Sequence, residues 1–229
     1  MTTLLLRLSA PIQSWGESSK FETRRTQSYP TKSGVIGLAA AALGISREDD
    51  EALRKLSALR FGLRIDKEGE LLRDYHTVSG EKPYITNRYY LCDATFLVGL
   101  ECEDATLLHK LEEAIKAPAY PLYLGRRSCP PTYPLVLGSR DKDLITALNE
   151  EPWLLPKWRQ DRIYGDEERR LRIIVEDNAS SAAVCDSPLS FSKKRRLFGW
   201  RGIKELGHIT FSSNDGVTDT QHDPFKELR

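Results

Sequence analysis

Residues 60–66, RFGLRID, decide the fold because apolar and charged side chains alternate along them. In a β-strand, Phe61, Leu63 and Ile65 would fall on one face and the charged residues on the other. We therefore predict a strand here. The segments on either side of it set the fold class.

The segment before this strand predicts a further strand and two helices. An apolar run at residues 4–8 is typical of a buried strand. Apolar residues then recur at helical spacing over residues 35–42 and again over residues 52–59. Ser46 and Asp49 precede the second of these runs at the spacing of a capping box.

The segment after residue 66 predicts two more strands and one more helix. Residues 71–78 continue as a strand, and alternating apolar residues predict a third strand over residues 90–101. A helix then starts at Asp104 and is stopped by Pro118. Strand, helix, strand, strand, helix is most of the ferredoxin-like βαββαβ unit that RNA-recognition modules share. The expected fold class is therefore α+β, and such a frame proves no function by itself.

A domain boundary is predicted near residue 118, because the sequence after it becomes irregular and rich in proline. We expect a ferredoxin-like domain at residues 1–118 and a smaller, irregular, β-rich domain at residues 119–229. The connection at residues 77–90 suits a hairpin that reaches out from the first domain. A basic, aromatic segment occupies residues 191–201 of the second domain.

The overall composition limits the classes of function. The chain of 229 residues has 34 Lys and Arg against 33 Asp and Glu, so it is neither a strongly basic nucleic-acid binder nor an acidic tail protein as a whole. This balance is compatible with local basic patches. No apolar run approaches the roughly 18 residues of a membrane span, and the N-terminus lacks a signal-peptide pattern. We expect a cytoplasmic protein.

Neither a metal ion nor a cofactor is expected. The four cysteines lie far apart without a C-x-x-C pair, so they lack the spacing of a zinc site or a disulfide framework. The four histidines are scattered and build no metal-binding signature.

The long loop before the first helix has the composition of a nucleic-acid contact. From Lys20 to Ser46 the chain has four basic residues and one acid, and aromatic residues lie between them. Such segments bind phosphates while their rings stack on unpaired bases. The candidates in this loop are Gln13, Trp15, Arg24, Arg25 and Lys32. The alternative is a solvated loop whose tryptophan packs in the core.

The start of the first helix is a second candidate for phosphate binding. Lys32, Ser33 and Gly34 stand where unpaired N–H groups and the positive end of the helix dipole would be exposed. Gly34 would allow a close approach, and Lys32 would add a counter-charge. The segment is not a P-loop, because it lacks the glycines of G-x-x-x-x-G-K-[ST], so nucleotide hydrolysis is not supported.

Residues 123–130 form a third basic segment. Arg126 and Arg127 are adjacent, and no acid occurs over residues 117–138. Because arginine favours bidentate phosphate contacts, this loop with its Tyr123 suits an RNA backbone. An ordinary surface turn is the alternative.

His76 leaves two hypotheses open. It follows Asp74 in the predicted strand, and a metal-free ribonuclease needs a positioned acid and base near a 2′-hydroxyl. The sequence identifies no catalytic partner for it. We expect an RNA-contacting or structural His76, with a catalytic His76 as the alternative.

Five ordered motifs are similar to those of one known family. They are APIQSWG (10–16), PTKSGVIGL (30–38), RDYHTV (73–78), YLCDA (90–94) and YLGRRSCP (123–130). Together they resemble the CasD family of the RAMP superfamily, whose members are subunits of the type I-E CRISPR Cascade complex. The resemblance covers roughly residues 4–137, and beyond them only the basic aromatic segment is similar.

The resemblance implies a non-catalytic subunit that binds the 5′ handle of the CRISPR RNA through an RNA-recognition-like domain and a thumb hairpin. It implies contacts with the backbone subunit CasC and the large subunit CasA, and only indirect contact with target DNA. The same complex holds CasB and the RNA-cleaving subunit CasE. Arg24 and Lys32 would hold handle phosphates. The residues that would line the groove or shape its wall are Gln13, Trp15, Arg88, Tyr123, Arg126 and Arg127.

One departure from the family pattern concerns the thumb. The connection from Val78 to Tyr90 is shorter than the family implies, which would limit its reach toward the neighbouring backbone subunit. The family also implies an alternative function, because the CasD-like subunit of type I-C systems processes repeat RNA as a metal-independent endoribonuclease. His76 is the candidate catalytic residue for that alternative.

Overall fold

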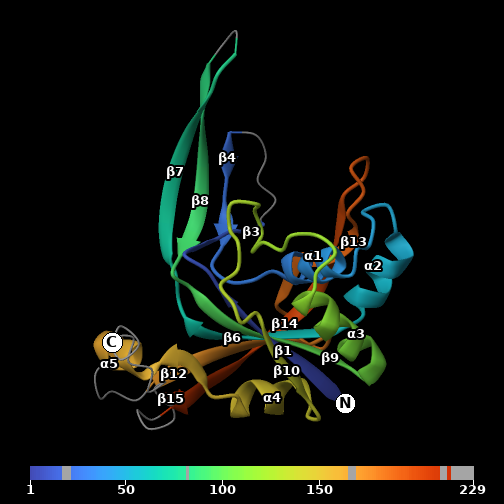
Figure 1. The fold of residues 1–229 in the computed structure, drawn as a ribbon, viewed down its shortest axis with the longest axis vertical. Coiled ribbons are helices and arrows are strands. Elements are labelled where there is room, and N and C mark those ends of the chain that lie inside the picture. The colour runs from blue at the N-terminus through green and yellow to red at the C-terminus, as the bar shows by residue number, and fades with distance from the viewer. Residues whose placement is uncertain (17–21, 81–82, 165–168, 212–215, 218–229) are drawn as a thin grey trace, which may run out of the picture.

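A seven-stranded antiparallel sheet runs through the middle of the molecule (Figure 1). The computed structural model describes residues 1–16, 22–80, 83–164, 169–211 and 216–217. In spatial order the strands are β10 (Val136–Arg140), β1 (Thr2–Ser9), β9 (Thr95–Cys102), β6 (Arg60–Lys67), β12 (Arg169–Glu176), β14 (Leu197–Phe211) and β13 (Ala183–Ser190). Every pair of neighbours in this order is antiparallel.

The connections among the first four strands follow the predicted order of elements. Helices α1 (Lys32–Ala42) and α2 (Asp50–Ser57) link β1 to β6, and α3 (Ala105–Lys116) links β9 to β10. The strands predicted at residues 4–8 and 60–66 and the helix predicted after Asp104 are therefore confirmed. The second helix is capped by Asp49, whose side chain accepts from the backbone N–H of Ala52 at 2.9 Å.

The third strand, predicted at residues 90–101, is confirmed as β9 from Thr95 onward, but its predicted start is wrong because the chain reverses before that residue. Asp93 has a φ of 55°, a left-handed conformation that Asp tolerates in turns. It separates β9 from β8 (Tyr84–Cys92), which pairs with β7 (Glu70–Val78) in a long hairpin. The apolar alternation continues through the turn and hides it.

This hairpin is longer than the predicted connection at residues 77–90. Its paired residues run from Glu70 opposite Cys92 to Val78 opposite Tyr84, and it projects from the body of the molecule (Figure 1). The sequence therefore underestimates the length of this hairpin. Four shorter strands lie at or near its base: β2 (Ile12–Gln13), β3 (Trp15–Gly16), β4 (Thr23–Arg24) and β5 (Thr26–Gln27).

Both faces of the main sheet are covered, so Arg64 and Asp66 on the charged side of residues 60–66 are buried. The helices α1, α2 and α3 pack on one face, and α4 (Leu144–Glu150) packs on the other. Arg64 is fully buried on the α4 side, where its Nε donates to Asp66 at 2.7 Å and its Nη1 donates to the carbonyl of Leu148 at 2.7 Å. The alternation predicts the strand correctly but does not imply a solvent-facing side.

The sheet also spans the domain boundary predicted near residue 118. The strands β10, β12, β13 and β14 all follow that residue and share the sheet with β1, β6 and β9. The remaining described elements after it are β11 (Trp153–Pro156), α5 (Lys157–Tyr164) and β15 (Gly216–Val217). None of the helices in the described ranges is long and apolar enough to cross a membrane.

Candidate nucleic-acid interface

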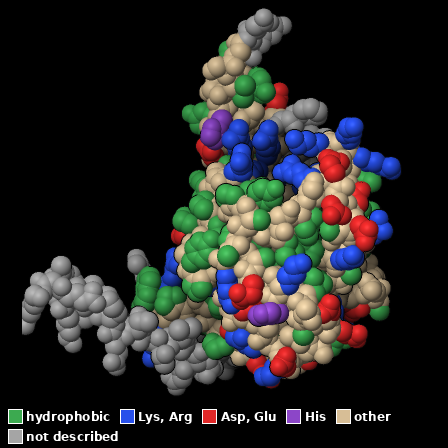
Figure 2. Space-filling view, turned by 45° about the vertical axis from the view of Figure 1, so that its right-hand side comes forward, with side chains coloured by type: hydrophobic (Ala, Val, Ile, Leu, Met, Phe, Trp, Pro, Cys, Tyr) green, Lys and Arg blue, Asp and Glu red, His purple; other side chains and the backbone are tan. Residues whose placement is uncertain are grey.

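Five arginines gather where the β7–β8 hairpin joins the body, and we call them the arginine cluster. They are Arg24, Arg25, Arg88, Arg126 and Arg127. Arg24 on β4 lies opposite Arg88 on β8 in a parallel pair. The Nη2 of Arg126 donates to the carbonyl of Arg24 at 2.9 Å. Figure 2 shows Lys and Arg side chains collected at the base of the projecting hairpin. Lys20, which belongs to the predicted basic loop, lies outside the described residues.

Arg126 is held in place by the floor of this cluster. Its guanidinium carbon lies 4.6 Å from the ring centre of Tyr90, within the range of a cation–π contact. Tyr90 is only 4% exposed, so its ring supports Arg126 from below. The sequence did not single out Tyr90 as a site residue, because its role depends on a loop more than thirty residues further along the chain.

The loop at residues 123–130 is anchored tightly to the segment before β3. The backbone N–H of Ser14 donates to the carbonyl of Leu124 at 3.1 Å. Gly125 has a φ of 90°, and a Cβ added there would lie 1.6 Å from the carbonyl oxygen of Ser14. Leu124 and Cys129 are fully buried, and this burial raises the pKa of the Cys129 thiol. The loop therefore presents Arg126 and Arg127 from a fixed backbone, with Tyr123 partly exposed beside them.

The cluster has more cationic donors than acceptors. Among the described residues, Arg24, Arg88, Arg126 and Arg127 form no ion pair with a carboxylate. Two nitrogens, Arg88 Nε and Arg126 Nη1, are buried and have no hydrogen-bond partner in the described part of the chain. Uncompensated cations and unsatisfied donors of this kind suit an anionic ligand.

Gln13 and Trp15 lie beneath the surface, which corrects their predicted contact with RNA. They are 0% and 1% exposed. The indole N–H of Trp15 donates to Gln13 Oε1 at 3.2 Å, and Gln13 Nε2 donates to the carbonyl of Ala94 at 2.8 Å. Because both side chains are enclosed and satisfied internally, they support the loops from inside. The alternative of a core tryptophan is the one that the structure shows.

The phosphate site predicted at the start of α1 is occupied by the protein's own carboxylates. The backbone N–H of Lys32 donates to Asp186 Oδ2 at 2.8 Å, and Lys32 Nζ donates to Glu176 Oε2 at 2.8 Å. Lys32 is 3% exposed, and burial lowers its pKa. Asp186 in turn accepts from Arg201 Nε at 2.6 Å. The prediction is wrong because acids from β12 and β13 reach this helix end.

Ser33 and Gly34 also serve the interior. Ser33 Oγ donates to Thr31 Oγ1 at 3.4 Å, and Thr31 caps the helix by accepting from the N–H of Gly34 at 3.2 Å. A Cβ at Gly34 would lie 2.9 Å from Trp15 Cε3. The close approach that Gly34 allows is therefore that of Trp15.

The family model of the CRISPR-associated protein Cas5 matches residues 3–204. The chain belongs to the Cas5 family. The Cascade subunit CasD of Escherichia coli (strain K12) is 43% identical to it over 175 residues, which cover 65% of this chain and 77% of that protein.

Two solved structures resemble this Cas5 chain over nearly its whole length. One, described as a CRISPR RNA-guided surveillance complex, matches with a TM-score of 0.80 and 32% identity, covering 99% of this chain and 98% of the other. The other, described as the crystal structure of a Cas protein, has a TM-score of 0.72 and 39% identity, with coverage of 93% and 97%. The mixed α/β fold is therefore that of Cas5 relatives.

His76 lies on the projecting hairpin of this Cas5 protein, on the same face as Arg88. Its Nε2 is 2.5 Å from Asp74 Oδ2, and both side chains are more than 40% exposed. The register places Asp74 opposite Arg88 and His76 opposite Thr86. The described residues contain no group of three or more His, Cys, Asp or Glu side chains that could hold a metal ion.

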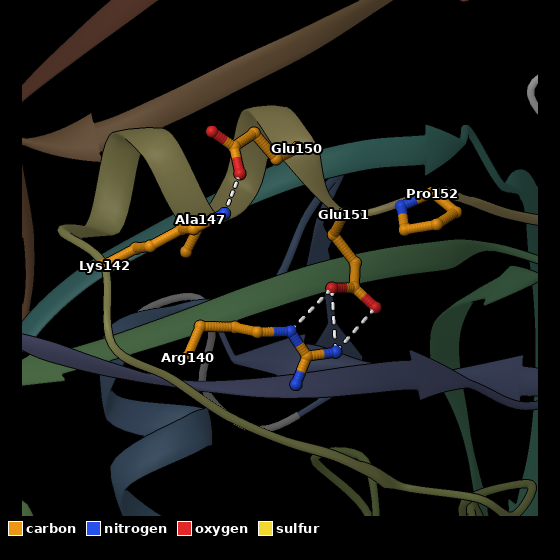
Figure 3. A pocket seen from close by; sticks show the side chains of 6 residues that line it. All are labelled: Arg140, Lys142, Ala147, Glu150, Glu151 and Pro152. Atoms are coloured by element: carbon orange, nitrogen blue, oxygen red, sulfur yellow. Dashed lines mark hydrogen bonds and ion pairs between the residues drawn. The ribbon is translucent and has the colours of Figure 1, made fainter.

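A pocket at the other end of this Cas5 protein provides a contrast with the cluster (Figure 3). Its cations are neutralised by adjacent acids: Arg140 Nη2 donates to Glu151 at 2.9 Å, and Lys142 pairs with Glu150. Its basic side chains are therefore not available to an external anion, whereas those of the arginine cluster are.

Proposed function

We propose that the chain is a non-catalytic subunit of a type I-E Cascade surveillance complex and binds the 5′ handle of the CRISPR RNA. The arginine cluster is the observation that carries the proposal. It concentrates five guanidinium groups on β4, the residue that follows it, β8 and the loop at residues 123–130. Arginine forks match phosphate oxygens. The relatives support this assignment, since one is a Cascade subunit and one structure is of an RNA-guided complex.

The sheet order supports the finer assignment to a ferredoxin-like RAMP frame. Strands β10, β1, β9 and β6 lie side by side, with the helices connecting β1 to β6 and β9 to β10 on one face. This is the split βαβ arrangement of that frame. The β7–β8 hairpin then corresponds to the thumb.

The thumb hairpin supports contact with the backbone subunit CasC. One of its faces exposes Leu71, Tyr75 and Ile85, each more than half exposed, although apolar side chains of this size favour burial. We assign that face of the thumb to CasC. We also propose that this chain contacts CasA, and that CasB and CasE complete a cytoplasmic complex. Target DNA is reached only through the guide RNA.

Replacement of Arg126 and Arg127 by Ala in the assembled complex tests the proposal. The variant should retain less guide RNA, with the deficit growing as the salt concentration rises, because two phosphate contacts are lost. Replacement of Arg54 and Lys55, which are exposed on α2, removes the same charge and should have no effect. Equal RNA retention by both variants over a salt series would refute the proposal.

The short contact between His76 and Asp74 favours a second candidate function, that of a metal-independent endoribonuclease. An imidazole oriented by a carboxylate is a component of acid–base catalysis. The test is to incubate the purified chain with repeat RNA in EDTA. We expect intact RNA; cleavage at a specific position that disappears in His76→Ala would establish the enzyme instead.

A further inference from the structure

A second basic surface lies on the β13–β14 hairpin, and we call it the β13–β14 strip. It consists of Lys193, Lys194, Arg195, Arg196, Phe198 and Trp200. Residues 187–204 contain six cations and no acid. Only one of the six, Arg201, is buried and bonded to Asp186. The arginine cluster does not include this surface.

The turn of the strip is anchored to α1. The guanidinium of Arg196 lies 5.1 Å from the ring centre of Phe198 and 5.9 Å from that of Phe191. Phe191 packs over Gly37, since a Cβ at Gly37 would lie 3.7 Å from its ring. The exposed Lys193, Lys194 and Arg195 therefore extend from a fixed base.

Trp200 provides a stacking surface beside these cations. It is 74% exposed, whereas Trp15 and Trp153 are each 1% exposed. It lies opposite Cys185 on the edge strand β13 and on the same face of β14 as Phe198. A large aromatic ring that remains in water next to cations matches the composition of single-strand binding surfaces.

The strip and the arginine cluster are neighbours along α1. Gly34 packs against Trp15. The residue before Trp15, Ser14, packs through its carbonyl against Gly125 in the loop at residues 123–130. Gly37, one helical turn further along α1, contacts Phe191 of the strip's base. The β7–β8 and β13–β14 hairpins extend toward the same end of the molecule (Figure 1), over which Lys and Arg side chains gather (Figure 2).

We propose that the β13–β14 strip binds single-stranded RNA that continues from the arginine cluster, which rests on the function proposed above. The cations contact phosphates and Trp200 stacks on a base, so the contact is independent of sequence. A protein partner fits less well, because lysine is depleted from the cores of protein interfaces and the strip has two adjacent lysines.

Fluorescence anisotropy with two labelled RNAs tests the proposal on the purified full chain. One RNA has about 8 nucleotides and fits a single site, and the other has about 20 and spans both. Trp200→Ala should weaken binding of the longer RNA about tenfold and leave the shorter unchanged. Replacing Lys193, Lys194 and Arg195 by Ala should flatten the slope of log affinity against log salt by about 2 for the longer RNA.

Matched controls separate this proposal from general charge and from the arginine cluster. Tyr120→Ala removes an exposed aromatic elsewhere, and the triple replacement of Arg54, Lys55 and Lys110 removes equal charge; neither should change binding. Arg126→Ala with Arg127→Ala should weaken both RNAs. If it weakens neither while the strip variants weaken the longer RNA, the strip binds RNA and the proposed function fails.

Two results would overturn the proposal. If the strip variants bind the longer RNA as tightly as the control variants do, the strip does not contact RNA. If those variants also fail to assemble into the complex, the strip binds a protein partner instead. The second is a tryptophan fluorescence that does not change when the longer RNA is added. RNA stacked on Trp200 should quench its fluorescence, and Trp200→Phe should abolish that quench; no quench by the longer RNA would exclude stacking.

Discussion

The N-terminus of α1 and the arginine cluster are both basic, yet the structure uses them in opposite ways. At α1, Lys32 is buried against Glu176, and Arg201 is buried against Asp186. At the cluster, the arginines are at the surface, and four of them have no ion pair among the described residues. The difference teaches that a cation is available to an external anion only where the fold brings no carboxylate to it.

Breaking the buried pair should have the largest effect on stability. Glu176→Leu leaves Lys32 charged and unpaired in the interior, and we expect it to lower the free energy of unfolding by about 3–5 kcal/mol. Urea denaturation measures this loss. RNA affinity of the folded fraction should be unchanged, because Lys32 does not reach the surface.

The double variant Lys32→Met with Glu176→Leu is the control for that loss. It removes both charges together, and replacing a buried pair by apolar residues is often neutral or stabilising, so most of the stability should return. The contrast between the start of α1 and the arginine cluster would be wrong if the double variant were as stable as the wild type but bound RNA more weakly. Lys32 would then belong to the RNA site.

Displacing the loop at residues 123–130 tests the same contrast at the arginine cluster. Gly125→Ala keeps every charge, but its Cβ would overlap the Ser14 carbonyl at a residue with positive φ. We expect RNA affinity to fall about as far as in Arg126→Ala, with a loss of stability of about 1–3 kcal/mol. Anisotropy titration and urea denaturation measure the two effects. Unchanged affinity would mean that the loop's position does not matter.

Local pattern was sufficient for most elements up to residue 116, and it singled out the arginines that the structure brings together. The strand at residues 60–66 and the helices α1, α2 and α3 follow from hydrophobic periodicity, whereas α5 was not predicted. The loop at residues 123–130 stands out in the sequence as part of a run without acids. The predictions for Lys32 and Gln13 failed because their partners, Glu176 and Ala94, are distant in sequence. Whether a polar side chain is exposed or satisfied internally depends on such long-range contacts.

The hairpin shows a second limit of sequence pattern. The alternation over residues 90–101 is shared by β8 and β9, and only the left-handed Asp93 separates them. Asp is depleted in strands and favoured in turns, so Asp93 was a turn signal that the apolar alternation around it outweighed. The error shortened the predicted thumb and assigned Tyr90 to a strand of the main sheet.

Tyr90 provides the finest test, because its ring orients Arg126 without adding charge. Tyr90→Leu should weaken RNA binding only about three- to fivefold, as expected for loss of a cation–π contact worth about 1 kcal/mol. Tyr90→Phe keeps the ring and should bind normally. In an Arg126→Ala background, Tyr90→Leu should have no further effect on affinity, because the pair acts as one unit. Additive losses in this anisotropy cycle would show that Tyr90 contacts RNA independently of Arg126.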